Sequence, residues 1–266
     1  MTTESNSFCF KWHVPQRPLS DFVGLLWYWR GHESAYSKER VLPSGTVELV
    51  VKLGKGRASD AGISGPKSRY FVIERRTEDE LLGVHFKQGG GFPFFNFPIA
   101  ELHNGGGSLA AIWGEKSTGE MVELLHEALT IDEKFRLLEK WLMGAVCHSL
   151  EQHPAVSYAI EAFQHDPLLS SADMAEKVGF SQRRFIELFR SDVGLTPKLF
   201  CRVRRFQQVI RAVENREEVD WADVALSAGY YDQAHFIHDF QQFSGLTPKQ
   251  YLPLRTGHSN HVKIHE

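Results

Sequence analysis

The sequence predicts a two-domain protein: a β-rich amino-terminal domain, then connecting helices, then an all-α domain that contains a duplicated helix pair. The chain has 266 residues, and since a domain averages about 150 residues, two cores are expected. Up to about residue 115 the sequence is rich in Gly, Pro and aromatic residues, whereas later apolar residues recur every three or four positions. Residues 170–200 are repeated at 220–251.

The composition is that of a folded protein without a strong overall charge. Hydrophobic residues make up 42%, and 30 Lys and Arg stand against 33 Asp and Glu, a net charge of −3. Extended disorder is therefore disfavoured, and a polyanionic partner has to be argued from local charge. The sequence has no apolar run of membrane-spanning length and no secretion signal at its start, so we expect a cytoplasmic protein without membrane contact.

Neither a metal site nor a cofactor is expected. Cys9, Cys147 and Cys201 lie far apart, without zinc-site or disulfide spacing, and we interpret them as reduced thiols. His85 and His103 could bind a metal in a cupin-like barrel, but no His-x-His pair with a nearby Glu accompanies them, so structural roles are favoured.

Residues 1–117 are expected to form the β-rich domain, as a cupin-like barrel or an α+β fold. Apolar runs at 22–29, 46–53, 69–74 and 81–86 are separated by Gly and Pro, which is typical of an antiparallel sheet. Eight aromatic residues could line a ligand pocket, although a small barrel also uses such residues as core. They are Trp12, Trp27, Tyr28, Trp29, Phe92, Phe94, Phe95 and Phe97.

Residues 118–153 are predicted to form the connecting helices. Apolar residues recur there at helical spacing, and Thr130 before Asp132 and Glu133 is typical of a helix start.

The repeat gives each unit of residues 154–255 the same internal signals. Ala175 and Gly179 recur as Ala225 and Gly229. After one inserted residue, Phe-x-x-x-Phe and Gly-Leu-Thr-Pro recur as well, with Gly194 matching Gly245.

Each unit predicts a helix-turn-helix. The Ala permits close helix crossing, and the Gly after it permits a positive φ in a sharp turn. The second helix carries a buried stripe, expected to be Phe185, Leu188 and Phe189 in one unit and Phe236, Ile237 and Phe240 in the other. A linker helix starts at the first Thr-Pro. Such a second helix has the right width for a DNA major groove.

Local charge distinguishes the two units. Residues 170–212 hold nine cations and four anions, a net of +5, whereas 213–266 hold four cations and eight anions, a net of −4. At 100° per residue, the second helix of the first unit is expected to direct Arg183, Arg184, Glu187 and Arg190 outward. The second helix of the second unit is expected to direct His235, His238, Asp239 and Gln242 outward. Arg183 and Arg184 are expected to reach base edges and Arg190 a phosphate.

These motifs resemble the DNA-binding domain of AraC/XylS-type transcriptional regulators. The resemblance covers about the last hundred residues and rests on the paired Ala-x-x-x-Gly turns, Phe-x-x-x-Phe, Gly-Leu-Thr-Pro and the linker-helix residues Phe200, Arg205 and Phe206. By resemblance, the base-reading positions fall on Gln182, Arg183, Arg184 and Glu187 in the first unit and on Gln233, His235 and His238 in the second.

The resemblance also implies partners. Double-stranded DNA is the expected target, the β-rich domain would bind a small-molecule effector or form a homodimer, and an activator would contact RNA polymerase. The second unit has Gln241 and Gln242 where the family usually has basic residues. We therefore expect the first unit to supply most of the sequence-specific affinity.

Two other functions are alternatives. One is a regulator that works through protein contacts with degenerate DNA binding, and the other is a cupin-like small-molecule-binding or enzymatic domain with a helical accessory. No nucleophile elbow or phosphate-binding glycine loop with Lys is present, so an enzyme is not expected, and the triplets at 89–91 and 105–107 are interpreted as flexible loops.

Residues 256–266 are expected to form a frayed tail. His258, His261 and His265 have helical spacing there. They lie in a terminal segment after Pro253 and Gly257, so metal binding is disfavoured.

Overall fold

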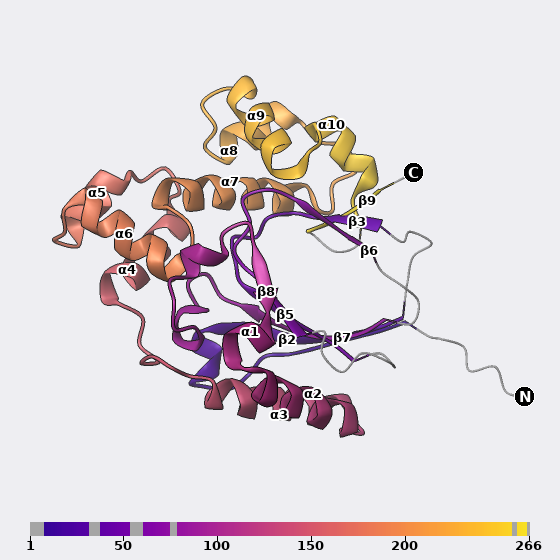
Figure 1. The fold of residues 1–266 in the computed structure, drawn as a ribbon. Helices are drawn as coiled ribbons and strands as arrows, with labels where there is room; N and C mark the ends of the chain where they lie inside the picture. The colour runs from indigo at the N-terminus through magenta and orange to yellow at the C-terminus, as the bar shows by residue number, and fades with distance from the viewer. Residues whose placement is uncertain (1–7, 32–37, 54–60, 75–78, 257–259, 265–266) are drawn as a thin grey trace, which may run out of the picture.

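The computed structural model describes residues 8–31, 38–53, 61–74, 79–256 and 260–264. In Figure 1 the carboxy-terminal helices form one layer, the strands lie beneath them, and two further helices cover the opposite side of the strands. Buried apolar residues form two clusters, one centred on the carboxy-terminal helices and one between the strands and the two further helices. The predicted combination of a β-rich part and a helical part is confirmed.

The larger sheet has six antiparallel strands. In spatial order they are β1 (Cys9–His13), β2 (Val23–Arg30), β7 (Glu80–Phe86), β4 (Glu48–Lys52), β5 (Ala61–Ser64) and β8 (Gly106–Ser108). Val, Leu and aromatic residues suit the central strands, where Leu26, Leu49 and Val84 are completely buried. The predicted runs at 22–29, 46–53 and 81–86 correspond to β2, β4 and β7.

The prediction of a flexible loop at 105–107 is wrong for Gly106 and Gly107. Both belong to β8, where Gly106 pairs with Ser64 and Gly107 with Ile63. A Cβ on Gly106 would lie 2.3 Å from the Ile63 carbonyl oxygen, so the strands can approach this closely only without a side chain.

Three helices follow the sheet: α1 (Leu109–Trp113), α2 (Glu115–Glu127) and α3 (Ile131–Gly144). The predicted start at Thr130 is confirmed, because its hydroxyl accepts a hydrogen bond from the Glu133 amide at 3.2 Å. Met121 and Leu125 of α2 and Leu138 of α3 are buried in the same core as the sheet.

A second sheet has three strands, in the order β6 (Phe71–Glu74), β3 (Lys38–Val41) and β9 (His261–Lys263). The prediction of a frayed tail is therefore wrong for 261–263, which pair antiparallel with β3. Val262 is fully buried and joins the core of the helical part, and this burial stabilises the strand. The carboxy-terminal end of the chain thus completes a sheet whose other strands come from the β-rich part.

The helical part begins at α4. Its elements are α4 (Pro154–His165), α5 (Ser171–Lys177), α6 (Gln182–Val193), α7 (Pro197–Val213), α8 (Trp221–Ser227), α9 (Gln233–Ser244), α10 (Pro248–Tyr251) and the 3-10 helix η4 (Leu252–Leu254). In Figure 1 the long helix α7 runs between a group formed by α4, α5 and α6 and a group formed by α8, α9 and α10. Within the described residues no helix is both long and apolar enough to cross a membrane.

Candidate nucleic-acid interface

The first repeat folds as a helix-turn-helix made of α5 and α6. Ser170 and Ser181 cap the two helices through their hydroxyls. Between them Gly179 has a φ of +74°, and the next residue, Phe180, donates its amide to the Ala175 carbonyl at 2.9 Å. The predicted turn is therefore confirmed, with glycine where the backbone is left-handed.

The second repeat, α8 and α9, reproduces this geometry with different caps. Asp220 and Asp232 accept the amide hydrogen bonds at the two helix starts. Gly229 has a φ of +79°, and the Tyr230 amide donates to Ala225 at 3.0 Å. The near-equal geometry of the two turns follows from the repeated Ala-x-x-x-Gly.

All predicted site residues of the first repeat share an exposed surface of α6. They are Gln182, Arg183, Arg184, Glu187 and Arg190. Arg183 Nε donates to Glu187 Oε1 at 3.0 Å, and the Arg183 side chain is 89% exposed. An exposed pair of this kind is weak, about 0.3–0.5 kcal/mol, so Arg183 can exchange Glu187 for another acceptor at little cost. The predicted outward arc of α6 is confirmed.

The second repeat differs from the prediction at two positions. Gln233 and His238 are exposed and His235 is half-buried, but Asp239 is only 1% exposed and Ile237 is 40% exposed. Placing Asp239 on the outward arc and Ile237 in the buried stripe was therefore wrong. Asp239 lies three residues after Phe236, a spacing that returns to the same helix face, whereas Ile237 is rotated by 100°.

A buried ion pair explains the position of Asp239. Arg202 of α7 donates from Nη2 to Asp239 Oδ1 at 2.5 Å and from Nε to Oδ2 at 3.3 Å. The same Nη2 contacts Gln242 Oε1 at 2.5 Å, and the guanidinium lies 5.3 Å from the Phe243 ring centroid. The only sequence signal for this contact was an acid at the i+3 position of an otherwise apolar stripe.

Arg205, the linker-helix residue expected from the family resemblance, also contacts the second repeat. Its guanidinium lies 5.2 Å from the centroid of the Tyr230 ring, directly after the Gly229 turn. Burial raises the pKa of Tyr230, so its phenol stays neutral at physiological pH. Arg205 and Arg202 together fix α7 against the second unit.

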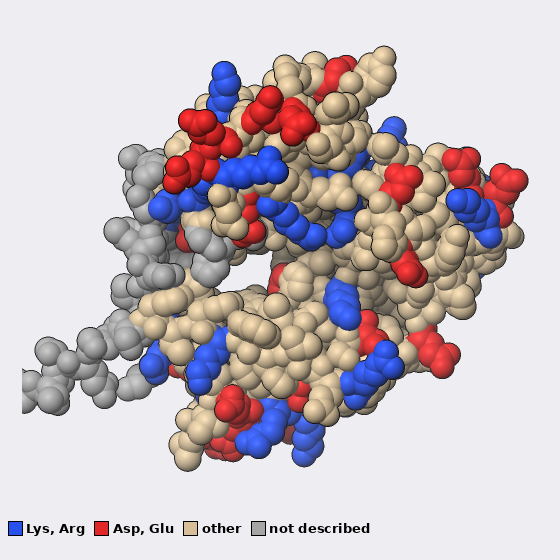
Figure 2. All heavy atoms as spheres, turned by 180° about the vertical axis from the view of Figure 1, so that it is seen from behind, with Lys and Arg blue, Asp and Glu red and all other residues tan. Residues whose placement is uncertain are grey.

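One groove, which we call the linker groove, lies between the start of α5, the linker helix α7 and the polar side of α9. It has a volume of about 680 Å³ and is lined by 167–171 before and at the start of α5, by Lys198, Arg202 and Arg205 of α7, and by His235, His238 and Gln242 of α9. Seen from behind, Lys and Arg side chains gather on the helical part, and some stand at the rim of a hollow that separates it from the β-rich part (Figure 2).

The other candidate side chains are engaged within the fold. His85 Nδ1 is hydrogen-bonded to Glu48, and His103 Nε2 lies 3.0 Å from Ser68 Oγ. Burial alone would lower the pKa of His85, but the charge and hydrogen bond of Glu48 raise it. His261 Nδ1 lies 2.9 Å from Glu39 Oε2, while His258 and His265 lie outside the described residues. No three metal-ligating side chains cluster anywhere in the part of the chain that is described.

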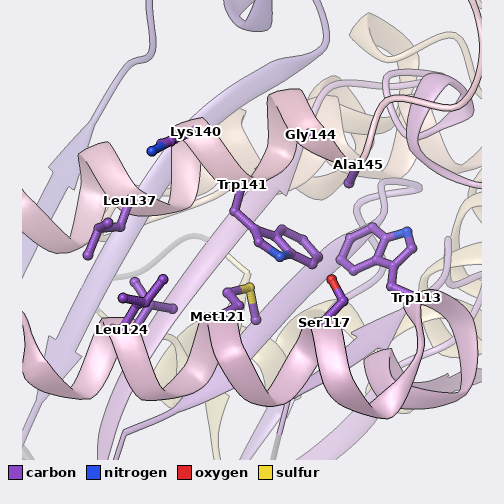
Figure 3. A pocket seen from close by; sticks show the side chains of 10 residues that line it. Trp113, Ser117, Met121, Leu124, Leu137, Lys140, Trp141, Gly144 and Ala145 are labelled. Carbon is purple, nitrogen blue, oxygen red and sulfur yellow. The ribbon is translucent and has the colours of Figure 1, made fainter.

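The aromatic residues proposed as a pocket have different environments in the structure. Phe94 and Phe95 are buried in the core, Trp12 is 63% exposed, and Trp27 lies against Gly83. A polar cavity of about 350 Å³ lies between the two sheets, and an apolar groove of about 480 Å³ lies between α2 and α3. In Figure 3 Trp113 and Trp141 lie at one end of the apolar groove and Leu124 and Leu137 at the other.

Two linked helix-turn-helix units with exposed polar second helices define a tandem DNA-binding domain. Residues 174–253 match a family model described as "Helix-turn-helix domain", and residues 11–106 match a "Domain of unknown function (DUF6597)". The carboxy-terminal part of the chain belongs to the AraC-type helix-turn-helix domains, as the sequence motifs indicate.

Curated relatives match part of the chain's length. An "Uncharacterized HTH-type transcriptional regulator" of Haemophilus influenzae is 31% identical over 117 residues, which is 44% of this chain and 35% of the relative. The "Melibiose operon regulatory protein" of Escherichia coli K12 is 29% identical over 93 residues, 35% of this chain and 30% of that protein. The chain thus matches about a third of the length of these relatives.

Solved structures match the chain at low similarity. ToxT from Vibrio cholerae is 12% identical with a TM-score of 0.42, covering 94% of this chain and all of that one (100%). The C-terminal domain of AraT, a response regulator from Geobacillus stearothermophilus, is 20% identical with a TM-score of 0.37, covering 40% of this chain and 89% of that one.

Proposed function

We propose that this protein is a transcriptional regulator that binds a specific duplex DNA sequence through two unequal helix-turn-helix units. The observation that carries the proposal is the repeated pair α5–α6 and α8–α9, with second helices whose outer residues are free to meet a ligand. The first unit would read bases through Gln182, Arg183, Arg184 and Glu187, with Arg190 on a phosphate. The second unit would contribute less, through Gln233, His235 and His238.

The weaker role of the second unit has a structural reason. The charge of Asp239 on α9 is neutralised by Arg202, and the outer surface of α9 is left with histidines and amides. Arg183 and Arg184 provide permanent cations at the start of α6, where bidentate contacts to guanine discriminate by about 1–3 kcal/mol per pair.

A regulatory ligand would bind in the polar cavity between the two sheets. Its lining includes Lys67, the Glu48–His85 pair and His261, so a small polar molecule with several hydrogen-bonding groups suits it. Burial and the charge of Arg69 lower the pKa of Lys67, and an anionic group of a ligand beside it would act in the opposite direction. A thermal-shift screen of small sugars and organic acids, run on wild type and on Lys67→Met, tests the site. A stabilising ligand should lose its effect in the variant.

A homodimer would use the α2–α3 groove, in whose lining Leu124 is 51% exposed. Sedimentation of the wild type and of Leu124→Glu tests this contact, since a charge there should favour the monomer. An in vitro transcription assay with RNA polymerase would then separate activation from repression.

The decisive experiment for the proposed function is selection of bound sequences from a random duplex pool with the full chain. Enrichment of one site, bound with an affinity that falls steeply with salt, is expected. If no sequence is enriched and the affinity is independent of salt, the chain acts through protein contacts or as an enzyme, and the proposal fails.

A further inference from the structure

The linker helix α7 separates its basic residues onto different faces. Lys198, Arg202 and Arg205 recur at helical spacing and line the linker groove between the two repeats. Arg211 of the same helix is exposed but does not line this groove, and Arg204 is half-buried. Three of the five α7 cations thus face one hollow that both DNA-binding units border.

The groove keeps a positive charge after its internal pair is formed. Asp239 is the one acidic residue in its lining, and Arg202 neutralises it. Lys198 is exposed and is not ion-paired within the described residues, while Arg205 stacks on Tyr230 rather than on a carboxylate. Counting Lys and Arg against Asp and Glu, Lys198 and Arg205 therefore leave the groove with a formal charge of +2.

The position of Lys198 is unfavourable for the isolated helix. It occupies the first turn of α7, which contains no acidic residue, and a cation there faces the positive end of the helix dipole. A helix would be slightly more stable with a neutral or acidic residue at this site. A ligand of opposite charge would offset the cost.

We propose that the linker groove holds the DNA phosphate backbone between the two major-groove segments, with Lys198 and Arg205 contacting phosphate oxygens. This rests on the proposed function, because the groove lies between the start of α5 and α9, which belong to the two units that would enter those segments. Arg202 is a positioning residue that fixes α9 through Asp239. Backbone contacts of this kind set the register of a protein on the duplex without reading its sequence.

The salt dependence of binding by the full chain tests the site. The probes are the selected duplex and an unrelated duplex of equal length, and the variants are Lys198→Ala, Lys198→Arg and the matched control Arg211→Ala. Loss of one phosphate contact should reduce the slope of log K against log salt by about 0.9. We expect this reduction of the slope in Lys198→Ala, together with an equal fold-loss of affinity for both duplexes. Arg211→Ala should keep the wild-type slope. Lys198→Arg should restore the slope to the wild-type value.

The experiment distinguishes a failure of the proposed phosphate site from a failure of the proposed function. If Lys198→Ala keeps the wild-type slope while Arg183→Ala weakens specific binding, the groove does not hold phosphate and the proposed function stands. An equal reduction of the salt slope in Arg211→Ala and Lys198→Ala would also overturn the site. It would indicate that the slope depends on the overall charge of the protein and not on a contact at Lys198. Absence of duplex binding by the wild type would overturn the proposed function and this site together.

Discussion

Gly194 and Gly245 hold the same position in the two repeats, and a single short segment of the β-rich part packs against both. A Cβ on Gly194 would lie 2.4 Å from Pro66 Cγ, and a Cβ on Gly245 would lie 2.3 Å from Tyr70 Cε1. Both glycines have positive φ, 85° and 70°. The segment 66–70 therefore bridges the ends of α6 and α9.

This bridge has a direct link to the polar cavity. Lys67 lies within it and lines the cavity between the sheets, while Arg40 donates to the Gly245 carbonyl at 3.1 Å and covers the Tyr70 ring at 4.9 Å. No sequence pattern in 66–70 predicts such a coupling role. Contact between the parts thus does not require α2 and α3, which lie on the far side of the larger sheet (Figure 1).

We predict that Tyr70→Ala loosens one DNA-binding unit relative to the other. Spin labels at positions 177 and 226, in a background with Cys9 and Cys147 replaced by Ser, would report the distance between the units. The distribution should be narrow in the parent and broader in Tyr70→Ala, with Arg40→Ala as a second bridge variant. Tyr158→Ala, at a half-exposed position of α4, is the size-matched control. If the distance distributions of both bridge variants are as narrow as that of the parent, α7 alone holds the two units together.

The first unit should dominate specific binding. Arg183→Ala is expected to weaken binding to the selected site by about 1–3 kcal/mol, roughly 5- to 150-fold, because a bidentate base contact is lost. His238→Ala should cost less, since an imidazole lacks the paired donors with which a guanidinium contacts guanine. Gel-shift titration of both variants on the same duplex decides this, and a larger loss from the histidine change would reverse the assignment of the two units.

The Arg202–Asp239 pair should stabilise the second unit strongly. Removing one partner of a buried pair leaves an uncompensated charge, so Asp239→Ala should lower the free energy of unfolding by about 3–5 kcal/mol. Glu187→Ala breaks the exposed pair with Arg183 and should cost less than about 1 kcal/mol. Urea denaturation compares the two, and equal effects would show that Asp239 is not buried with its partner.

Asp192 should make stability depend on pH. Burial raises the pKa of this α6 carboxyl from 3.8 to about 6, although the charge of His148 acts in the opposite direction. Because the pKa is higher in the folded state than in the unfolded state, the protonated carboxyl favours folding. Its contribution to the free energy of unfolding is fully present below pH 4 and is lost as the pH rises through 6.

Asp192→Asn tests this dependence. Its free energy of unfolding should exceed that of the wild type at pH 7 by up to about 3 kcal/mol, and the two should converge towards pH 4. Parallel curves from pH 4 to 7 would show that the carboxyl is solvated.

Local sequence patterns predicted the repeats, whereas contacts between residues far apart in the sequence were not predicted. Gly179, Gly229 and the Thr-Pro helix starts act within a few residues, and the structure agrees with each. The pairing of β9 with β3 joins positions more than two hundred residues apart, and no local pattern in 261–263 specifies that partner. Asp239 was misplaced for the same reason, because its burial depends on Arg202 from another helix.

The most direct test of the central claim is a hydroxyl-radical footprint of the full chain on its selected duplex. Two units on one surface should protect two backbone stretches on the same face of the DNA, separated by about one helical turn of 10 base pairs. Weaker protection is expected at the stretch that lies under α9. A single protected stretch, or two on opposite faces of the duplex, would contradict the account.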